Sequence, residues 1–365
     1  MESGEEGAKD EGTWLPPREA DDVLEPPGHP LVCKPVAEPG YGHPLLAPLA
    51  RAQDGIARLE ARAEAASPAV VEGLRARMAY REAAGWLAYG KVWIHPQDLA
   101  LRDAGLTGSY AVAAMAGRLA AELPATSASG SEIGLRPSDA AAGAALRLAR
   151  AWRRLAEHRT WAPLADAGAM RETLRSLGAG GSFTGAEIDE WLASVHARDQ
   201  ALALIRAGRA ARDWINRSAE ADPLGLDGMF LAACVWQQNG FGRAIALPFW
   251  TAPAQRHYRL ALWSGLRWMA GFLDCVAIAA KVGRDELHRL GEAEEKGRAL
   301  ARTARSRLPG ALEAVLRRPI VTARGLANGL DITPQAALGL LRELMEAGIV
   351  REATGRASWR AFVLA

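Results

Sequence analysis

The sequence predicts an all-α protein in which a large multi-helix domain precedes a C-terminal winged helix-turn-helix with a small β-hairpin. Three observations support this fold class. Apolar residues recur at helical spacing through most of the chain from Leu49 onward. Before residue 349 no run of residues alternates in the way that strands require. Over roughly the last fifty-five residues, long helical periodicity gives way to short elements separated by turn residues.

The chain divides by composition into three segments. Residues 1–48 are acidic and then rich in Pro and Gly, which buries little apolar surface, so we expect this segment to be mainly irregular or disordered. Residues 49–308 form the predicted helical domain, and residues 309–365 form the predicted winged helix-turn-helix. The 365 residues suffice for one large or two medium domains.

Within the helical domain, helix starts are marked by capping residues. Ser67 and Pro68 are an N-cap and first-turn pair, and Thr184 caps a helix that turns Ile188, Leu192 and Val195 to one face. His95, before Pro96, is expected to be a turn or cap residue. Further helices are predicted at residues 138–158, 199–214, 224–235, 257–282 and 286–308.

The C-terminal segment carries the most specific pattern. A short helix at residues 311–318 ends at Pro319. Thr322 then caps a helix that ends at Leu330, the turn Asp331-Ile332 follows, and Thr333 with Pro334 opens a second helix that stops at Gly348. Two helices joined by so short a turn are typical of the helix-turn-helix.

The turn itself departs from the usual pattern. Asp331 stands where Gly is common, and we expect a left-handed backbone there, tolerated with some strain. Strands at 349–351 and 359–363, joined by a hairpin at 353–356, complete a wing.

This arrangement predicts a set of residues that contact double-stranded DNA. On the second helix, Gln335 and Arg342 can reach base edges or phosphate, and Gly339 allows close approach to a backbone. Leu338 and Glu346 are expected on the same outer face. The full set of expected DNA-binding residues is Thr322, Arg324, Thr333, Gln335, Gly339, Arg342, Arg351, Arg356 and Arg360. The alternative is that the domain serves protein–protein contact alone.

Charge is distributed unevenly along the chain, although the net charge is only +2. Residues 298–365 contain eleven Arg and five acidic residues, an excess of positive charge that favours a polyanion. Of the 44 basic residues, only five are Lys; this bias is equally what a GC-rich genome produces.

Cysteine and hydropathy patterns indicate a cytoplasmic protein that does not enter a membrane. Three widely spaced cysteines (Cys33, Cys234, Cys275) without a CxxC pair favour buried free thiols in a reducing compartment. The acidic N-terminus lacks the apolar core of a signal peptide. The longest apolar stretch, residues 268–280, is too short to span a bilayer and is expected to be a core helix.

Motifs for catalysis, metals and cofactors are not found in the sequence. The seven His show no HExxH or HxH pair, and neither a Walker A loop nor a GxSxG elbow is present. We therefore expect no metal, no cofactor and no enzymatic activity. Eight tryptophans at apolar helical positions are expected to pack in the core rather than to stack on bases: Trp152, Trp161, Trp191, Trp214, Trp236, Trp250, Trp263 and Trp268.

Several stretches together resemble an alphaproteobacterial, rhizobial-type family that is often plasmid-borne. They are residues 94–103 (IHPQDLALRD), 105–110 (GLTGSY), 240–244 (GFGRA), 246–250 (ALPFW) and 348–362 (GIVREATGRASWRAF). The resemblance covers most of the chain from about residue 50. It implies a domain of unknown function followed by a helix-turn-helix DNA-binding domain, and no particular activity.

A weaker similarity is to Fic-type adenylyltransferases, which also run through a helical core into a C-terminal winged helix. Their HPFxxGNGR motif, laid on residues 235–243, matches Gly240, Gly242 and Arg243. Val235 stands at the catalytic His position and has no group that could deprotonate a hydroxyl, and Phe241 replaces the Asn. This resemblance implies a scaffold whose catalytic motif has degenerated.

Taken together, these patterns predict a non-enzymatic regulator of transcription or of plasmid-associated functions that binds double-stranded DNA, with the helical domain dimerising or sensing a partner. We expect a homodimer. The alternative is a Fic-like nucleotide-binding or adenylyl-transferring enzyme that uses the winged helix for autoregulation; a polar pocket around Arg243 would favour it.

Overall fold

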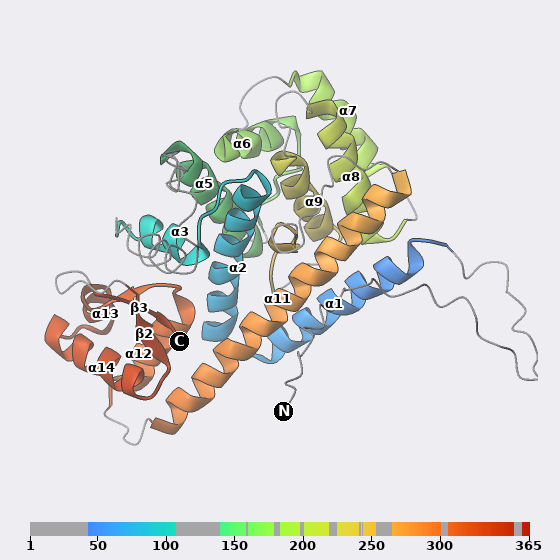
Figure 1. Cartoon of the computed structure of the whole chain (residues 1–365). Helices are drawn as coiled ribbons and strands as arrows, with labels where there is room; N and C mark the ends of the chain where they lie inside the picture. The colour runs from blue at the N-terminus through green and yellow to red at the C-terminus, as the bar shows by residue number, and fades with distance from the viewer. Residues whose placement is uncertain are drawn as a thin grey trace, which may run out of the picture. The chain divides into compact units, whose positions relative to one another are not determined.

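Helices make up most of the described chain, and the strands are confined to its C-terminal end (Figure 1). The computed structural model describes residues 43–106, 139–157, 160–178, 183–197, 201–218, 225–240, 242, 244–252, 265–300, 306–353 and 360–365. Residues from His43 to Ala365 belong to one compact unit. The predicted fold class is therefore confirmed.

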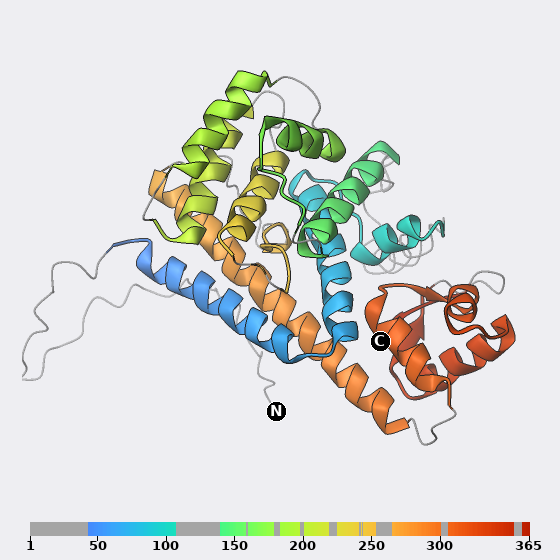
Figure 2. The same cartoon turned by 180° about the vertical axis from the view of Figure 1, so that it is seen from behind.

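The helical domain is arranged along one long helix. In order, the described helices of this domain are α1 (Leu46–Ala65), α2 (Pro68–Tyr89), α3 (Pro96–Asp103), α5 (Asp139–Glu157), α6 (Ala167–Leu177), α7 (Gly185–His196), α8 (Ala203–Ser218), α9 (Leu226–Gln238) and α11 (Gly265–Leu300). α1 lies along α11 in both views (Figures 1 and 2), and α2 packs on both α5 and α11.

The predicted caps are found at the helix starts. The Ser67 hydroxyl accepts from the Val70 N–H, His95 Nδ1 accepts from the Gln97 N–H, and Thr184 forms a reciprocal capping box with Glu187. α1 begins at Leu46, three residues before the predicted start, and residues 1–42 of the predicted irregular segment lie outside the described residues.

One prediction about the helical domain is wrong. Residues 257–282 and 286–308 were expected to form two helices, but α11 runs unbroken over 36 residues from Gly265 to Leu300. Gly283, at the expected break, lies inside the helix, where a Cβ would crowd the Leu59 side chain of α1. The glycine therefore allows close packing of α1 rather than ending a helix.

Aromatic side chains fill the core of the helical domain, as predicted for the described tryptophans. Trp191 and Trp214 are fully buried with ring centroids 5.3 Å apart, and Trp268 stacks on Phe272 at 5.5 Å. Trp152, Trp236 and Trp250 are also buried, and Trp161 is partly buried; Trp263 lies outside the described residues.

The C-terminal domain (residues 308–365) contains three helices and a small sheet. Its elements are α12 (Leu308–Arg317), β1 (Val321–Thr322), α13 (Ala323–Leu330), α14 (Pro334–Glu346), β2 (Val350–Glu352) and β3 (Ala361–Leu364). The sheet is antiparallel with the order β1-β3-β2, and Val321 pairs with Phe362. Strands β2 and β3 were predicted from the sequence, whereas β1, which is only two residues long, was not.

Candidate nucleic-acid interface

Local interactions fix the starts of α13 and α14 and the turn between them. The Thr322 hydroxyl accepts from the Gly325 N–H at 3.0 Å, and the Thr333 hydroxyl accepts from the Ala336 N–H at 3.2 Å. Each threonine thus pairs one of the backbone N–H groups that the first turn of its helix leaves without a partner. Between them Asp331 adopts the expected left-handed backbone (φ 54°, ψ 52°), and the N–H of Ile332 bonds the carbonyl of Ala327. This geometry fixes the angle at which α14 leaves α13.

An apolar stripe holds the two helices against α12 and the sheet. Leu326 and Ala327 of α13 are buried. The buried residues of α14 are Ala337, Leu341 and Leu344. Leu338, expected on the outer face, is partly buried against the core instead, because it flanks this stripe directly.

The opposite face of α14 is exposed and polar. Gln335, Gly339 and Arg342 all lie on it at spacings of four and three residues, so they form one row along the helix. A Cβ at Gly339 would meet no atom within 4 Å, so the protein's own packing does not explain a glycine there. Glu343 and Glu346 are also exposed and border the row with negative charge.

The remaining predicted contact residues of α13 and α14 are placed as follows. Arg324 is exposed on the first turn of α13. Thr322 and Thr333 use their hydroxyls as helix caps. Asn328 was not predicted, yet it is exposed one turn after Arg324. Helical spacing from Arg324 would have identified it.

The two described wing arginines, Arg351 and Arg360, make contacts away from the row on α14. Arg351 shares the outer face of the sheet with its partner Val363 and donates to the Gln97 side-chain oxygen of α3 at 3.0 Å. Arg360 lies 4.0 Å from the Glu352 carboxylate across the strand pair. Arg356 lies outside the described residues. No local pattern in the sequence indicates the contact between Arg351 and Gln97, which are 254 residues apart.

The C-terminal domain is anchored to the helical domain by a buried arginine. Arg77 of α2 donates to the main-chain oxygens of Leu316 (2.6 Å), Val315 (2.9 Å) and Arg318 (3.1 Å), which are free because α12 ends there. Burial lowers the pKa of Arg77 to about 10, still well above neutral, and the buried Glu286 carboxylate opposes that shift. Arg77 therefore stays charged and caps α12 from outside the domain.

Two glycines allow the helices to approach closely at this junction. A Cβ on Gly73 of α2 would overlap the Leu316 carbonyl oxygen, and one on Gly297 of α11 would overlap the Leu312 side chain. α12 thus packs directly on the backbones of α2 and α11.

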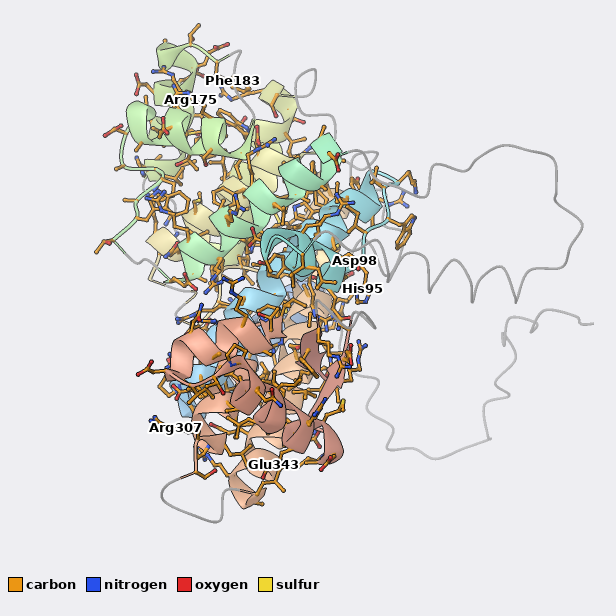
Figure 3. The ribbon with its side chains drawn as sticks, turned by 90° about the vertical axis from the view of Figure 1, so that its left-hand side faces the viewer. His95, Asp98, Arg175, Phe183, Arg307 and Glu343 are labelled. Carbon is orange, nitrogen blue, oxygen red and sulfur yellow. The ribbon has the colours of Figure 1, made fainter. Side chains whose placement is uncertain are left out.

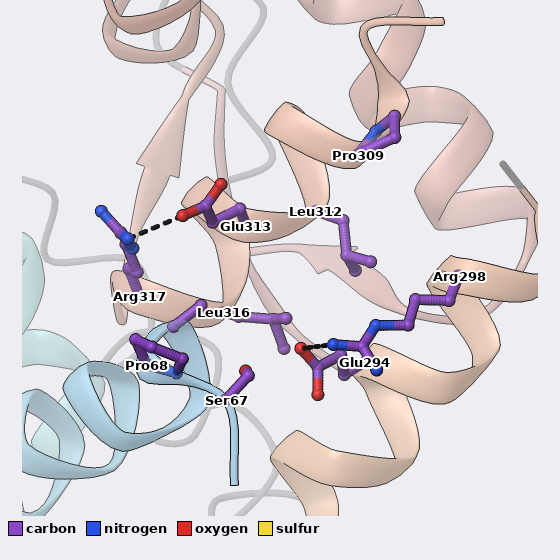
Figure 4. A pocket seen from close by; sticks show the side chains of 11 residues that line it. Ser67, Pro68, Glu294, Arg298, Pro309, Leu312, Glu313, Leu316 and Arg317 are labelled. Carbon is purple, nitrogen blue, oxygen red and sulfur yellow. Dashed lines mark hydrogen bonds and ion pairs between the residues drawn. The ribbon is translucent and has the colours of Figure 1, made fainter. Parts of the chain in front are cut away.

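A cavity of about 370 Å³, which we call the α12 cavity, opens beside these contacts (Figure 4). Leu312 and Leu316 contribute its apolar surface. Its charged side chains pair with each other: Arg298 bonds Glu294, and Arg317 bonds Glu313. The cavity therefore has no excess of either charge among these four residues.

In the part of the chain that the structure describes, the thiols and the position matching a Fic-type catalytic His are buried. Cys234 and Cys275 are buried free thiols, as expected, and burial raises the pKa of both, so they remain protonated at neutral pH; Cys33 lies outside the described residues. Val235, at the position of a Fic-type catalytic His, is also buried. Phe241 and Arg243 lie outside the described residues.

The described residues contain neither a cluster of metal ligands nor a helix that could span a membrane. No group of three or more His, Cys, Asp or Glu side chains in these residues could hold a metal ion. Among the described helices, none combines the length and apolar character needed to cross a bilayer.

Comparison with known proteins bears on the C-terminal domain. No curated protein matched the chain. Residues 308–364 match a protein family described as a helix-turn-helix (HTH) DNA binding domain, and this range runs from the first residue of α12 to the last residue of β3. The chain therefore contains a C-terminal helix-turn-helix DNA-binding domain.

Proposed function

We propose that this protein reads double-stranded DNA with α14 and regulates transcription or a plasmid-associated function, without enzymatic chemistry of its own. The observation that carries the proposal is the exposed row of Gln335, Gly339 and Arg342 on the second helix of the helix-turn-helix. In this motif the second helix enters the major groove with its N-terminal half toward the bases. Gln335 suits adenine and Arg342 suits guanine or phosphate.

Arg324 has a different part in this proposal. The first helix of a helix-turn-helix crosses the DNA backbone, and Arg324 is exposed on the first turn of α13. A guanidinium at that place contacts phosphate, which carries no sequence information. We infer further that two chains act together on a site with two half-sites, as dimers of this motif do.

The test is a set of salt titrations on a preferred duplex, selected from genomic fragments with the full chain, and on a random duplex. We expect Gln335→Ala or Arg342→Ala to cost about 1–3 kcal/mol on the preferred duplex and much less on the random one. Arg324→Ala should weaken binding to both and reduce the salt slope by about one phosphate contact.

The control is Arg175→Ala, which removes one arginine from α6, far from the C-terminal domain (Figure 3). It should leave both affinities and the salt slope unchanged. Equal losses on both duplexes for Gln335→Ala and Arg342→Ala would show that α14 does not read bases. No DNA binding by the full chain at low salt would leave protein–protein contact as the role of the domain.

A further inference from the structure

A second cavity, which we call the junction cavity, lies between the helical domain and the sheet of the C-terminal domain. It has a volume of about 230 Å³ and is bounded by side chains from α2, α3, α11 and the sheet. His95, which lines it, marks its place where α3 meets the C-terminal domain (Figure 3). The outer face of the sheet is covered here, since Val363 lies on that face and is 2% exposed.

Positive charge dominates the lining of the junction cavity. Arg77, Arg81, Arg289 and Arg351 line it, and Glu286 is the one acidic residue among the lining residues that the structure describes. Glu286 is buried and accepts from Arg81 at 2.6 Å and from Arg289 at 3.3 Å, with Arg77 at 3.6 Å. One carboxylate neutralises one unit of charge, so four guanidinium groups leave a net positive lining.

The α12 cavity shows that this excess is not a general property of cavities in an arginine-rich chain. Its two arginines face two glutamates, and each arginine bonds a glutamate. The junction cavity differs because its single carboxylate is shared by three arginines.

Two of the four arginines, Arg81 and Arg351, have N–H groups that can donate to a ligand. Arg77 is committed to the carbonyls of α12, and Arg289 bonds a main-chain oxygen of Ala365 as well as Glu286. Arg81 is partly exposed and bonds Glu286 through one nitrogen. Arg351 is exposed and donates to the neutral amide of Gln97 rather than to a carboxylate.

His95 supports the same electrostatic picture. Its Nδ1 accepts from the Gln97 N–H at 3.2 Å, so the neutral ring carries its proton on Nε2 and can donate there. Burial lowers the His95 pKa, and the nearby charges of Arg81 and Arg351 lower it further. The ring thus experiences the positive potential of the cavity and stays neutral at physiological pH.

We propose that the junction cavity binds a small, compact oxyanion bearing carboxylate or phosphate groups, held between Arg81 of α2 and Arg351 of β2. Guanidinium groups bind both kinds of oxyanion through paired N–H donors. The volume is below the range of drug-sized ligand sites and suits a ligand of few atoms. Because Arg351 belongs to the wing and Arg81 to the helical domain, the ligand bridges the two and alters the contact between Arg351 and Gln97.

Binding is tested by titrating the full chain with pyrophosphate and, separately, with citrate, at constant ionic strength in chloride, by calorimetry and by thermal shift. We expect saturable binding at one site per chain for at least one of the two, and which one binds identifies the ligand class. Arg351→Gln and Arg81→Gln should each weaken binding about tenfold or more, because each removes a charge-assisted hydrogen bond.

Two matched variants remove an arginine elsewhere. Arg298→Gln changes the α12 cavity and Arg342→Gln changes the α14 face, and both should keep anion binding. Arg351→Gln is the decisive variant, because Arg351 is exposed and its loss leaves the buried Glu286 network intact. The proposal would be overturned if neither anion showed saturable binding. It would also be overturned if Arg342→Gln lost anion binding while Arg351→Gln kept it.

The regulatory consequence rests on the proposed DNA-binding function and has its own readout. The bound anion should change the affinity of the full chain for the preferred duplex, and bound DNA should change the anion affinity by the same factor, since coupling between two sites is reciprocal. The change should vanish in Arg351→Gln at anion concentrations that the variant no longer binds. Anion binding without DNA binding would defeat the proposed function and leave the cavity assignment standing. If Arg81→Gln weakens DNA binding while no free anion binds, the lining contacts DNA and the small-anion proposal fails.

Discussion

At the scale of single residues, the most informative side chain is Glu82, a carboxylate with no exposed surface. It accepts from the N–H groups of Phe249 (2.8 Å) and Trp250 (2.6 Å) and from the Thr251 hydroxyl (2.7 Å). One side chain of α2 thus satisfies the backbone of a buried non-helical segment, which would otherwise have donors without partners. Burial raises the pKa of Glu82, although these hydrogen bonds act in the opposite direction.

The sequence predicts the start of α2 at Ser67 and Pro68, but it does not indicate the role of Glu82 within that helix. Its partners are 167–169 residues away, and a Glu on an amphipathic helix is ordinarily solvated. The one local signal is that Ala83, Ala84 and Gly85 follow it, so that its surroundings are apolar and small.

Glu82→Gln should be tolerated, whereas Glu82→Ala should lower the free energy of unfolding by several kcal/mol. The amide oxygen of Gln can accept from Phe249 and Trp250, but Ala leaves buried N–H groups unpaired at about 1–3 kcal/mol each. Urea unfolding midpoints at neutral pH measure both effects. Equal stability of Glu82→Ala and wild type would show that this segment does not depend on the carboxylate.

The same variant tests the pKa shift. A folded-state pKa above the ordinary 4.5 means that the stability contributed by protonated Glu82 is present below pH 4.5 and is lost as the pH rises through the folded value. Wild type should therefore lose stability relative to Glu82→Gln over that rise. Glu187 is a control whose pKa shifts in the opposite direction, because its hydrogen bonds to Thr184 lower its pKa. The stability that ionised Glu187 contributes is present above pH 4.5 and is lost as the pH falls through its folded-state pKa.

At the scale of elements, the sequence predicts capped and punctuated helices well and contacts between distant segments poorly. Thr322, Asp331 and Thr333 each determine their own backbone through local hydrogen bonds or left-handed geometry, and all three predictions are confirmed. β1 was missed because two residues show no alternation. The prediction divided α11 between residues 282 and 286, but the helix continues through Gly283, whose lack of a Cβ allows close packing against Leu59 of α1.

Gly339→Ala should stabilise the C-terminal domain but weaken its binding to DNA. The helix interior favours Ala over Gly by about 1 kcal/mol, and no atom lies within 4 Å of the new Cβ, so the domain should become more stable. If α14 lies in the major groove, the added methyl group obstructs the close approach of DNA, and affinity for the preferred duplex should fall. Thermal unfolding and DNA titration of the same sample measure the two effects.

Gly291→Ala in α11 is the matched control, since its Cβ also meets no atom within 4 Å and it lies outside the C-terminal domain. It should raise stability without altering DNA affinity. Unchanged DNA affinity in Gly339→Ala would instead place the DNA away from this face of α14.

At the scale of the whole molecule, the family boundary at residue 308 is not a boundary of the apolar core. One continuous cluster of buried residues extends from Leu49 to Leu364. Changes in periodicity predicted a domain boundary between residues 308 and 309, but no pattern in the sequence indicates the contacts that join the two domains in the structure. That joint depends on Arg77, Gly73 and Gly297, which are ordinary helix residues until α12 is placed against them.

Because of this joint, the C-terminal domain should be less stable alone than in the full chain. We expect hydrogen exchange of the α14 amides to be faster in a fragment of residues 306–365 and in full-length Arg77→Met. The variant leaves the carbonyls of Val315, Leu316 and Arg318 without Arg77, at about 1–3 kcal/mol for each that stays buried and unpaired, while Glu286 keeps its ion pairs with Arg81 and Arg289. Arg58→Met, which breaks an exposed pair with Asp54 on α1, should cost less than about 0.5 kcal/mol and leave α14 protected. Equal α14 protection in the fragment, Arg77→Met and wild type would mean that the C-terminal domain folds independently and that the anchoring by Arg77 contributes nothing to its stability.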